Sequence, residues 1–261
     1  MKKTLLLAVG LLAMGALGLS QVGAEDLSGD EIIKRVMKSD PWGLSGAEIA
    51  AHLTLIDKSG AKSRLTYSGK SMQYDPPLAK SVVRFSAPAD LAGAAFLQVQ
   101  KKEGDDERFM FLPELKRARR IAGGLRSNAF MGTDFTFADL DRRDWRESSA
   151  VVKTKETLGK HSCYVVHVTP KSADSDYSYV EMWVDEENFL PLKFNLYDRS
   201  KVLVKIFEAL ETKRVSGAWF ISKSKMTNVQ QKHTTELQLD QIAVKDKFPE
   251  DEFSVRALEK I

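Results

Sequence analysis

The sequence predicts a mainly β protein, a half-open antiparallel β-barrel of about eleven strands with an N-terminal helix and a short helical lid. Apolar and polar residues alternate in short stretches that recur about every 10 to 15 residues without intervening helices, a pattern typical of β-meanders. A run of about eleven strands does not stay flat, so the sheet is expected to curl. Residues 109–140 break the alternation, and we expect them to interrupt the sheet.

The beginning of the chain predicts an exported protein. Lys2-Lys3 precedes an apolar run, and the small residues Val22-Gly23-Ala24 suit signal peptidase. The apolar run is shorter than the about 20 residues of a membrane span. We therefore expect a signal peptide over residues 1–24, cleaved after Ala24, and a single periplasmic domain over residues 25–261.

Net charge and cysteine content argue against nucleic-acid binding and against a disulfide. Loss of Lys2 and Lys3 lowers the formal net charge from +3 to +1, and this near-neutral balance argues against nucleic acid as a partner. Cys163 is the single cysteine, so an intrachain disulfide is impossible, and its apolar strand predicts a buried free thiol. We expect a monomer.

A helix is predicted after the signal peptide. Ser28 and Glu31 have the spacing of a capping box, and an apolar stripe follows at Ile32, Ile33, Val36 and Met37. Residues 41–43, Pro-Trp-Gly, are expected to end the helix. The stripe predicts packing on the sheet, with a part in a ligand gate as the alternative.

The alternating strands predict an apolar concave face. One face collects Leu53, Leu55, Val83, Phe85, Leu97, Val99, Phe109, Phe111, Val180, Met182, Val184, Phe194 and Leu196. These residues suffice to line a hollow, but a solid core would use the same residues, so they leave both interpretations open.

The interrupting segment favours the hollow. It contains an apolar strand, a turn at Pro113-Glu114, a basic strand and then large apolar residues with helical spacing at Phe130, Met131, Phe135 and Phe137. This last stretch is too short and polar to build its own core, so we interpret it as a lid over the concave side. We predict that Phe109, Phe111, Phe130, Met131, Phe135, Phe137 and Met182 form the lid and wall of an apolar ligand site.

Two features of this segment have alternative interpretations. Gly123, Gly124 and Gly132 are either hinges of the lid or ordinary turn residues. The basic run contains Arg117, Arg119 and Arg120, which either protect a solvated sheet edge or dock an anionic lipid headgroup, a membrane surface or a partner protein.

The residues offer no catalytic set. The sequence lacks the nucleophile elbow, the phosphate-binding glycine loop and the zinc-protease motif, and we expect no enzymatic activity and no cofactor. The four histidines lie far apart in the sequence and predict no metal site. Asp134, Asp139, Asp141 and Asp144 are expected to form ordinary charge pairs with Arg142, Arg143 and Arg146.

A family resemblance rests on two stretches of the central segment. Residues 112–121, with Leu112-Pro113 and the arginines, and residues 130–140, with Phe-Met-Gly-Thr-Asp-Phe-Thr and Asp139-Leu140, resemble the signature of the outer membrane lipoprotein-sorting protein family. That family belongs with the LolA/LolB-like periplasmic carriers. The resemblance implies a LolA-like half-open barrel whose apolar cavity shelters acyl chains.

The resemblance also implies a role and partners. It indicates carriage of lipoprotein acyl chains or lipids between the inner and outer membranes, with an inner-membrane transporter as a possible partner. The alternative is a periplasmic sensor or regulatory subunit that binds a lipid or lipoprotein signal and a membrane partner. An enzyme acting on envelope lipid is disfavoured, because the sequence lacks a catalytic set.

Overall fold

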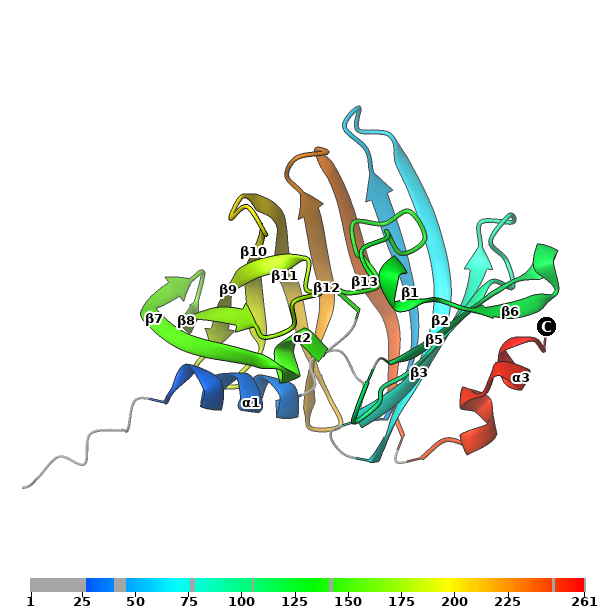
Figure 1. Ribbon diagram of the computed structural model, residues 1–261, viewed down its shortest axis with the longest axis horizontal. Helices are drawn as coiled ribbons and strands as arrows, with labels where there is room; N and C mark the ends of the chain where they lie inside the picture. The colour runs from blue at the N-terminus through cyan, green and yellow to red at the C-terminus, as the bar shows by residue number, and fades with distance from the viewer. Residues whose placement is uncertain are drawn as a thin grey trace, which may run out of the picture.

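A single curved antiparallel sheet organises the protein (Figure 1). The computed structural model describes residues 27–39, 46–75, 78–104, 106–140, 143–245 and 247–260. Its sheet has thirteen strands: β1 (Ala47–Ile56), β2 (Lys62–Asp75), β3 (Leu78–Ala87), β4 (Ala95–Val99), β5 (Glu107–Leu112), β6 (Arg117–Arg120), β7 (Ser148–Leu158), β8 (His161–Pro170), β9 (Tyr177–Asp185), β10 (Pro191–Asp198), β11 (Leu203–Val215), β12 (Ala218–Asn228) and β13 (His233–Val244). The expected signal peptide lies outside the described residues.

The strand order places the ends of two meanders at opposite edges. The order is β6-β5-β4-β3-β2-β1-β13-β12-β11-β10-β9-β8-β7, so the first and last strands pair in the middle. Strands β6 and β7 are consecutive in the sequence but form the two edges. The chain between them must therefore cross the open side of the sheet. The predicted half-open antiparallel fold is confirmed, with thirteen strands where about eleven were expected, and the predicted basic strand is β6.

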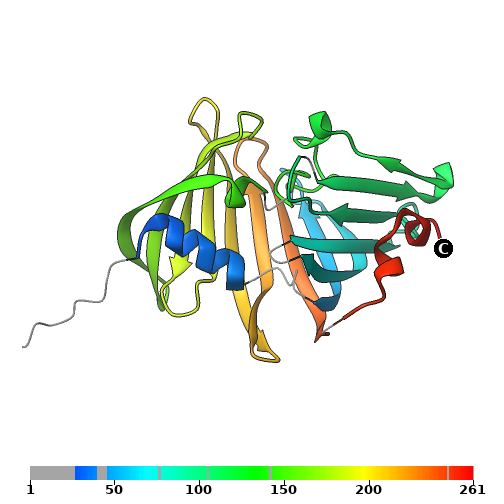
Figure 2. The same ribbon diagram turned by 60° about the horizontal axis from the view of Figure 1, so that its bottom comes forward.

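The predicted N-terminal helix is α1 (Gly29–Ser39), which fills one half of the concave side (Figure 2). The backbone N–H of Glu31 donates to Ser28 Oγ over 3.2 Å, which is one half of the expected capping box. Ile32, Ile33 and Val36 are buried against the inner side chains of β8 to β11. Asp30 fixes the start of the helix by accepting from the Ala150 N–H of β7 at 2.7 Å. The helix therefore occupies the hollow of this half.

The C-terminal segment covers the outer face of the other half. It contains the 3₁₀ helix η3 (Glu250–Phe253) and the short helix α3 (Val255–Leu258). Phe248, Phe253 and Leu258 form a buried cluster with outward side chains of β2 to β5. Arg84 of β3 donates to the carbonyls of Ala257 and Leu258, at 3.2 and 3.0 Å, and so holds the end of α3.

This outer cluster corrects one sequence-based assignment. Phe109 and Phe111, with Leu97 and Val99, lie in the cluster of the C-terminal segment rather than on the concave side. Strand β4 is buried on both faces, because Ala95, Phe96 and Leu97 are all nearly inaccessible. Alternating burial is therefore missing there, and apolar character alone does not distinguish the two faces.

Candidate functional site

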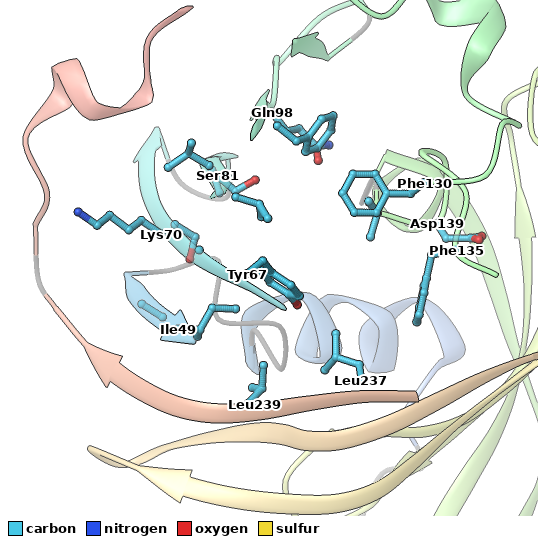
Figure 3. Close-up of a pocket in the computed structure, with 18 of the residues that line it drawn as sticks. Ile49, Tyr67, Lys70, Ser81, Gln98, Phe130, Phe135, Asp139, Leu237 and Leu239 are labelled. Atoms are coloured by element: carbon cyan, nitrogen blue, oxygen red, sulfur yellow. The ribbon is translucent and has the colours of Figure 1, made fainter. Parts of the chain in front are cut away.

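A cavity of about 240 Å³ lies on the concave side of the half that α1 does not fill (Figure 3). Strands β1 to β4 and β11 to β13 form its wall, and residues of the crossing segment form its cover. The apolar side chains that line it include Ile49, Leu53, Val83, Phe96, Phe130, Phe135, Leu140, Trp145, Phe207, Phe220, Ile221, Leu237 and Leu239. Such a site can hold a hydrocarbon group away from water.

The cover is the segment of residues 127–140, which we call the lid. The lid crosses between the sheet edges as a compact loop held by a bridge between Ala129 and Thr136. The Phe130 N–H donates to the Phe135 carbonyl at 2.7 Å, and Thr133 Oγ1 donates to the Phe130 carbonyl at 2.6 Å. The expected helical lid is therefore wrong. Met131 and Gly132 both have positive φ, 51° and 74°, which breaks a helix.

Aromatic packing fixes the inner face of the lid. Phe130 lies 5.3 Å from the Phe96 ring of β4 and 6.0 Å from the Phe85 ring of β3, measured between centroids. Phe137 packs edge-on against Phe130 at 5.6 Å. Phe130 and Phe135 also line the cavity, so a change in the position of the lid changes the shape of the cavity.

A buried carboxylate ties the lid to β13. Asp134 Oδ2 accepts from Thr235 Oγ1 at 2.7 Å and lies 2.7 Å from His233 Nδ1. The backbone N–H of Asp134 in turn donates to Thr235 Oγ1 at 2.9 Å. Asp134 and Thr235 are nearly inaccessible to solvent, so these hydrogen bonds are shielded from competing water. We call these contacts the Asp134 latch.

A second carboxylate ties the end of the lid to β9 and β11. Asp139 accepts from the Tyr177 hydroxyl and from Lys205 Nζ, each at 2.6 Å, and from the Thr136 N–H at 2.8 Å. Burial, and then the neighbouring Asp139 charge, raises the pKa of Tyr177 well above its ordinary value, so this hydroxyl stays a donor. We call these contacts the Asp139 latch.

The two latches correct the expected charge pairing. Asp134 and Asp139 were predicted to pair with nearby arginines, but their partners are His233, Thr235, Tyr177 and Lys205, far away in the sequence. Asp141 and Arg142 lie outside the described residues, as do the side chains of Arg143 and Asp144.

The remaining predicted site residues lie around the cavity rather than on its surface. Phe137 is buried behind Phe130, and Met131 packs on the same cluster. Met182 is buried beneath α1 in the filled half of the concave side. With Phe109 and Phe111 on the outer face, the cavity surface includes two of the seven predicted residues, Phe130 and Phe135. Phe109, Phe111 and Met182 do not line this cavity.

The polar residues of the cavity wall were missed. Ser71, Ser81, Gln98 and Gln100 line the same cavity as the apolar side chains. The alternation of Gln98 and Gln100 with Leu97 and Val99 predicted the opposite orientation, because apolar residues were assigned to the interior. One sequence feature could have indicated their position: the polar residues of this strand are uncharged, whereas an exposed strand face more often carries charged residues.

The predicted docking arginines lie on the edge strand β6. Arg117, Arg119 and Arg120 are all exposed, and none forms an ion pair with another residue that the structure describes. The register sets Arg117 and Arg119 beside Leu112 and Met110, whereas Arg120 lies beside Phe109 on the opposite face. The patch is therefore divided between two faces.

Two further histidines each pair with one aspartate, and the single cysteine is buried. Among the described residues, no group of three or more His, Cys, Asp or Glu side chains could hold a metal ion. His161 lies 2.5 Å from Asp185 and His52 lies 2.9 Å from Asp240, each measured from Nδ1 to Oδ2. Burial raises the pKa of Cys163 to about 11, so its thiol is protonated at neutral pH.

Comparison with known proteins places the fold. A family model described as "Uncharacterized protein" matches residues 77–260. An outer membrane lipoprotein-sorting protein domain from Vibrio parahaemolyticus shares 26% identity, with 89% of this chain and 98% of that chain covered and a TM-score of 0.83. No curated protein matches the sequence.

Two further solved structures have the same fold. A DUF1329 family protein from Desulfovibrio piger shares 22% identity over 88% of this chain and 97% of that chain, with a TM-score of 0.82. A LolA superfamily protein from Nitrosomonas europaea shares 16% identity over 88% and 98% of the two chains, with a TM-score of 0.70. In the part of the chain that the structure describes, no helix has the length and apolar character to cross a membrane.

Proposed function

The chain belongs to the family whose model matches residues 77–260, and from this premise and its LolA-like fold we propose that it is a periplasmic lipid carrier. In this role it shelters the acyl chains of lipoproteins or lipids during transfer between the inner and outer membranes. It acts without a chemical reaction, as a monomeric domain of residues 25–261. A signal peptide of residues 1–24 exports it, and an inner-membrane transporter supplies or receives the cargo.

The observation that carries this proposal is the apolar cavity beneath the lid. Each CH₂ group moved from water into an apolar site is worth about 0.8 kcal/mol, so a 16-carbon chain represents on the order of 12 kcal/mol. A free acyl chain therefore does not cross an aqueous compartment on its own. A concave apolar wall with a movable cover provides the shelter that such a chain needs.

The size of the cavity explains why the cover must move. An apolar cavity of about 150 Å³ holds one benzene molecule, and drug-sized ligands occupy sites of roughly 300–1,000 Å³. At about 240 Å³ the cavity beneath the lid has room for part of one hydrocarbon chain. A complete chain therefore needs more room, which displacement of the lid would provide, because the hydrogen bonds of the two latches can break and form again.

The proposal is tested by filling the cavity from its wall. Gly69 lines the cavity on β2, and a Cβ at this position meets the flexible Ile49 side chain at 3.2 Å. We expect Gly69→Leu to decrease binding of a fluorescent 16-carbon fatty acid at least about tenfold, because the new side chain occupies the space of about three buried CH₂ groups. Fluorescence titration of the purified protein measures the change.

The control is the same substitution at an exposed glycine. A Cβ added at Gly124 would have no other atom within 4 Å, so Gly124→Leu adds equal apolar volume outside the cavity. This variant is expected to bind like the wild type. Equal binding by both variants contradicts the cavity as the site. Lipid that is bound but never passed from donor to acceptor vesicles contradicts carriage and favours a sensor.

A further inference from the structure

One end of the cavity is polar. The strand registers set Ser71 of β2 opposite Ser81 of β3, Ser81 opposite Gln98 of β4, and Gln98 opposite Arg108 of β5. Directly opposed residues of antiparallel strands point to the same face. These four residues therefore form one row across four strands, and Ser71, Ser81 and Gln98 also line the cavity. We call this the polar row.

The polar side chains at this end of the cavity are buried and held by hydrogen bonds. Gln98 and Gln100 are 5% and 3% exposed, far less than glutamines on a protein surface. Gln98 Nε2 donates to Asp106 Oδ2 at 3.3 Å, and Gln100 Oε1 accepts from the Ala79 N–H at 3.0 Å. These bonds hold both amides in fixed orientations at the cavity.

Several polar atoms at the row remain available to a ligand. Ser81 and Gln100 both line the cavity, where the Ser81 hydroxyl and the Gln100 Nε2 amide can meet a bound ligand. Polar groups facing a dry cavity are costly unless a ligand or water satisfies them. The polar row therefore presents hydrogen-bond donors to whatever occupies the cavity.

The guanidinium of Arg146 lies close to these hydrogen-bond donors. Arg146 of α2 (Arg143–Arg146) lies beside Gln100, to whose Oε1 its Nη1 donates at 3.3 Å. Its Nη2 lies 3.7 Å from Asp106 Oδ1, a distance longer than a good charged hydrogen bond. The guanidinium is thus near the polar end of the cavity in long contacts that a better acceptor can replace.

The opposite wall is apolar. Figure 3 shows Ser81 and Gln98 across the cavity from Leu237 and Leu239 of β13. Phe130 of the lid closes the space beside them. A polar end facing an apolar wall matches a molecule with one polar head and one hydrocarbon tail.

We propose that the polar row with Gln100 and Arg146 is a headgroup subsite, at which the cavity binds the anionic oxygens of a single-tailed or multi-tailed lipid. This inference rests on the proposed lipid carriage and adds that the protein selects its cargo by the head. The head lies at Ser81, Gln98 and Gln100, and the tail extends toward Leu237, Leu239 and the lid. Phosphate and carboxylate heads share the required chemistry.

The test compares probes with one tail and different heads. The probes are hexadecanoate, 1-hexadecanol and 1-palmitoyl lysophosphatidylglycerol, each titrated by displacement of a fluorescent fatty alcohol. We expect the anionic probes to bind at least about tenfold more tightly than 1-hexadecanol, because a hydrogen bond to a charged group outweighs one to a hydroxyl. The tighter of the two anionic probes identifies the source as a phosphate or a carboxylate head.

Variants of the subsite assign the preference to these residues. Arg146→Gln is expected to reduce the anionic preference to less than about threefold while leaving 1-hexadecanol binding within about twofold. Arg146→Lys, which keeps the charge, is expected to restore part of it. Ser81→Ala is a milder change that removes one hydroxyl without altering the ion pairs. The matched control is Arg64→Gln, which changes an exposed arginine of β2 that does not line the cavity.

The outcomes separate this inference from the carrier proposal. Equal affinities of the wild type for all three probes, or an anionic preference unchanged in both Arg146→Gln and Ser81→Ala, overturn the headgroup subsite and leave lipid carriage intact. No binding of any probe overturns carriage itself. Loss of all binding in Gly69→Leu shows that the probes occupy this cavity.

Discussion

At the scale of single residues, Asp134 joins the lid to the sheet. Its carboxylate is buried, and its partners His233 and Thr235 both belong to β13. Removing a carboxylate from a buried network costs more than removing one from the surface, since the remaining donors lose a charged partner. Asp134 is therefore a residue at which a small change should release the lid while the strands stay paired.

The first prediction concerns this latch. In Asp134→Ala we expect the lid to open more often, with a loss of roughly 3 kcal/mol from two hydrogen bonds to a charged group. Limited proteolysis should cut residues 127–140 faster, and bound fatty acid should exchange between vesicles faster. Asp240→Ala is the control, because it removes the more exposed pair of Asp240 with His52 and does not touch the lid. Equal proteolysis of the two variants contradicts the latch.

The site residues that the sequence predicted best are those of the lid itself. Phe130 and Phe135 were identified because large apolar side chains on a short polar segment need an apolar surface to cover, and both line the cavity. The partners of Asp134 and Asp139 could not be predicted, because they lie about 40 to 100 residues away and nothing local in the sequence distinguishes them from surface carboxylates.

At the scale of secondary structure, edge strand β6 has part of its exposed backbone covered and also carries exposed arginines. The Ala118 N–H donates to Glu259 Oε1 at 2.8 Å, so the C-terminal segment satisfies part of the edge. Arg117 and Arg119 point to the concave face, the same face as the cavity. Charged side chains discourage pairing with another strand, and on this face they are also available to an anionic surface.

The second prediction distinguishes these two roles. We expect the double variant Arg117→Glu and Arg119→Glu to lose most of its association with vesicles containing anionic lipid, since each basic residue contributes about 1 kcal/mol near such a surface. Vesicle co-sedimentation at low and high salt measures the loss. Arg120→Glu changes the same strand on the opposite face, and it should retain more binding. Unchanged association of the double variant at low salt assigns both arginines to edge protection alone.

Secondary structure shows where local patterns suffice and where they fail. Helix α1 was predicted, because Ser28, Glu31 and the apolar stripe are local signals. The lid was mistaken for a helix, because the spacing of Phe130 and Phe137 fits a helical face as well as a loop whose side chains converge on one aromatic cluster. Met131 and Gly132 determine the outcome through positive φ, which periodicity does not reveal.

At the scale of the whole molecule, topology explains the lid. Two meanders that meet at β1 and β13 leave β6 and β7 at opposite edges, so the connection between consecutive strands crosses the open side. The sequence predicted the curled antiparallel sheet, because its strands recur without helices. It did not predict which face of β4 and β5 is interior, since the C-terminal segment makes both faces apolar there.

Because strands far apart in the sequence form the cavity, it exists only in the folded protein, and a ligand of the cavity binds only the folded state. A ligand that binds only the folded state stabilises it by about 2.7 kcal/mol at a concentration of 100 Kd. In a chain of this length, each kcal/mol raises Tm by about 2–4 °C. Hexadecanoate at this concentration, kept below micelle formation, should therefore raise Tm of the wild type by about 5–10 °C in scanning calorimetry.

The matched variants assign this thermal shift to the cavity. At the same hexadecanoate concentration, Gly69→Leu should show a much smaller rise, because its leucine occupies the space that the tail needs, whereas Gly124→Leu should follow the wild type. Asp134→Ala should start from a lower Tm and still rise, since its cavity remains and only the latch is lost. An equal rise in Gly69→Leu and the wild type means that the fatty acid stabilises another surface, and the cavity beneath the lid is then not where lipid binds.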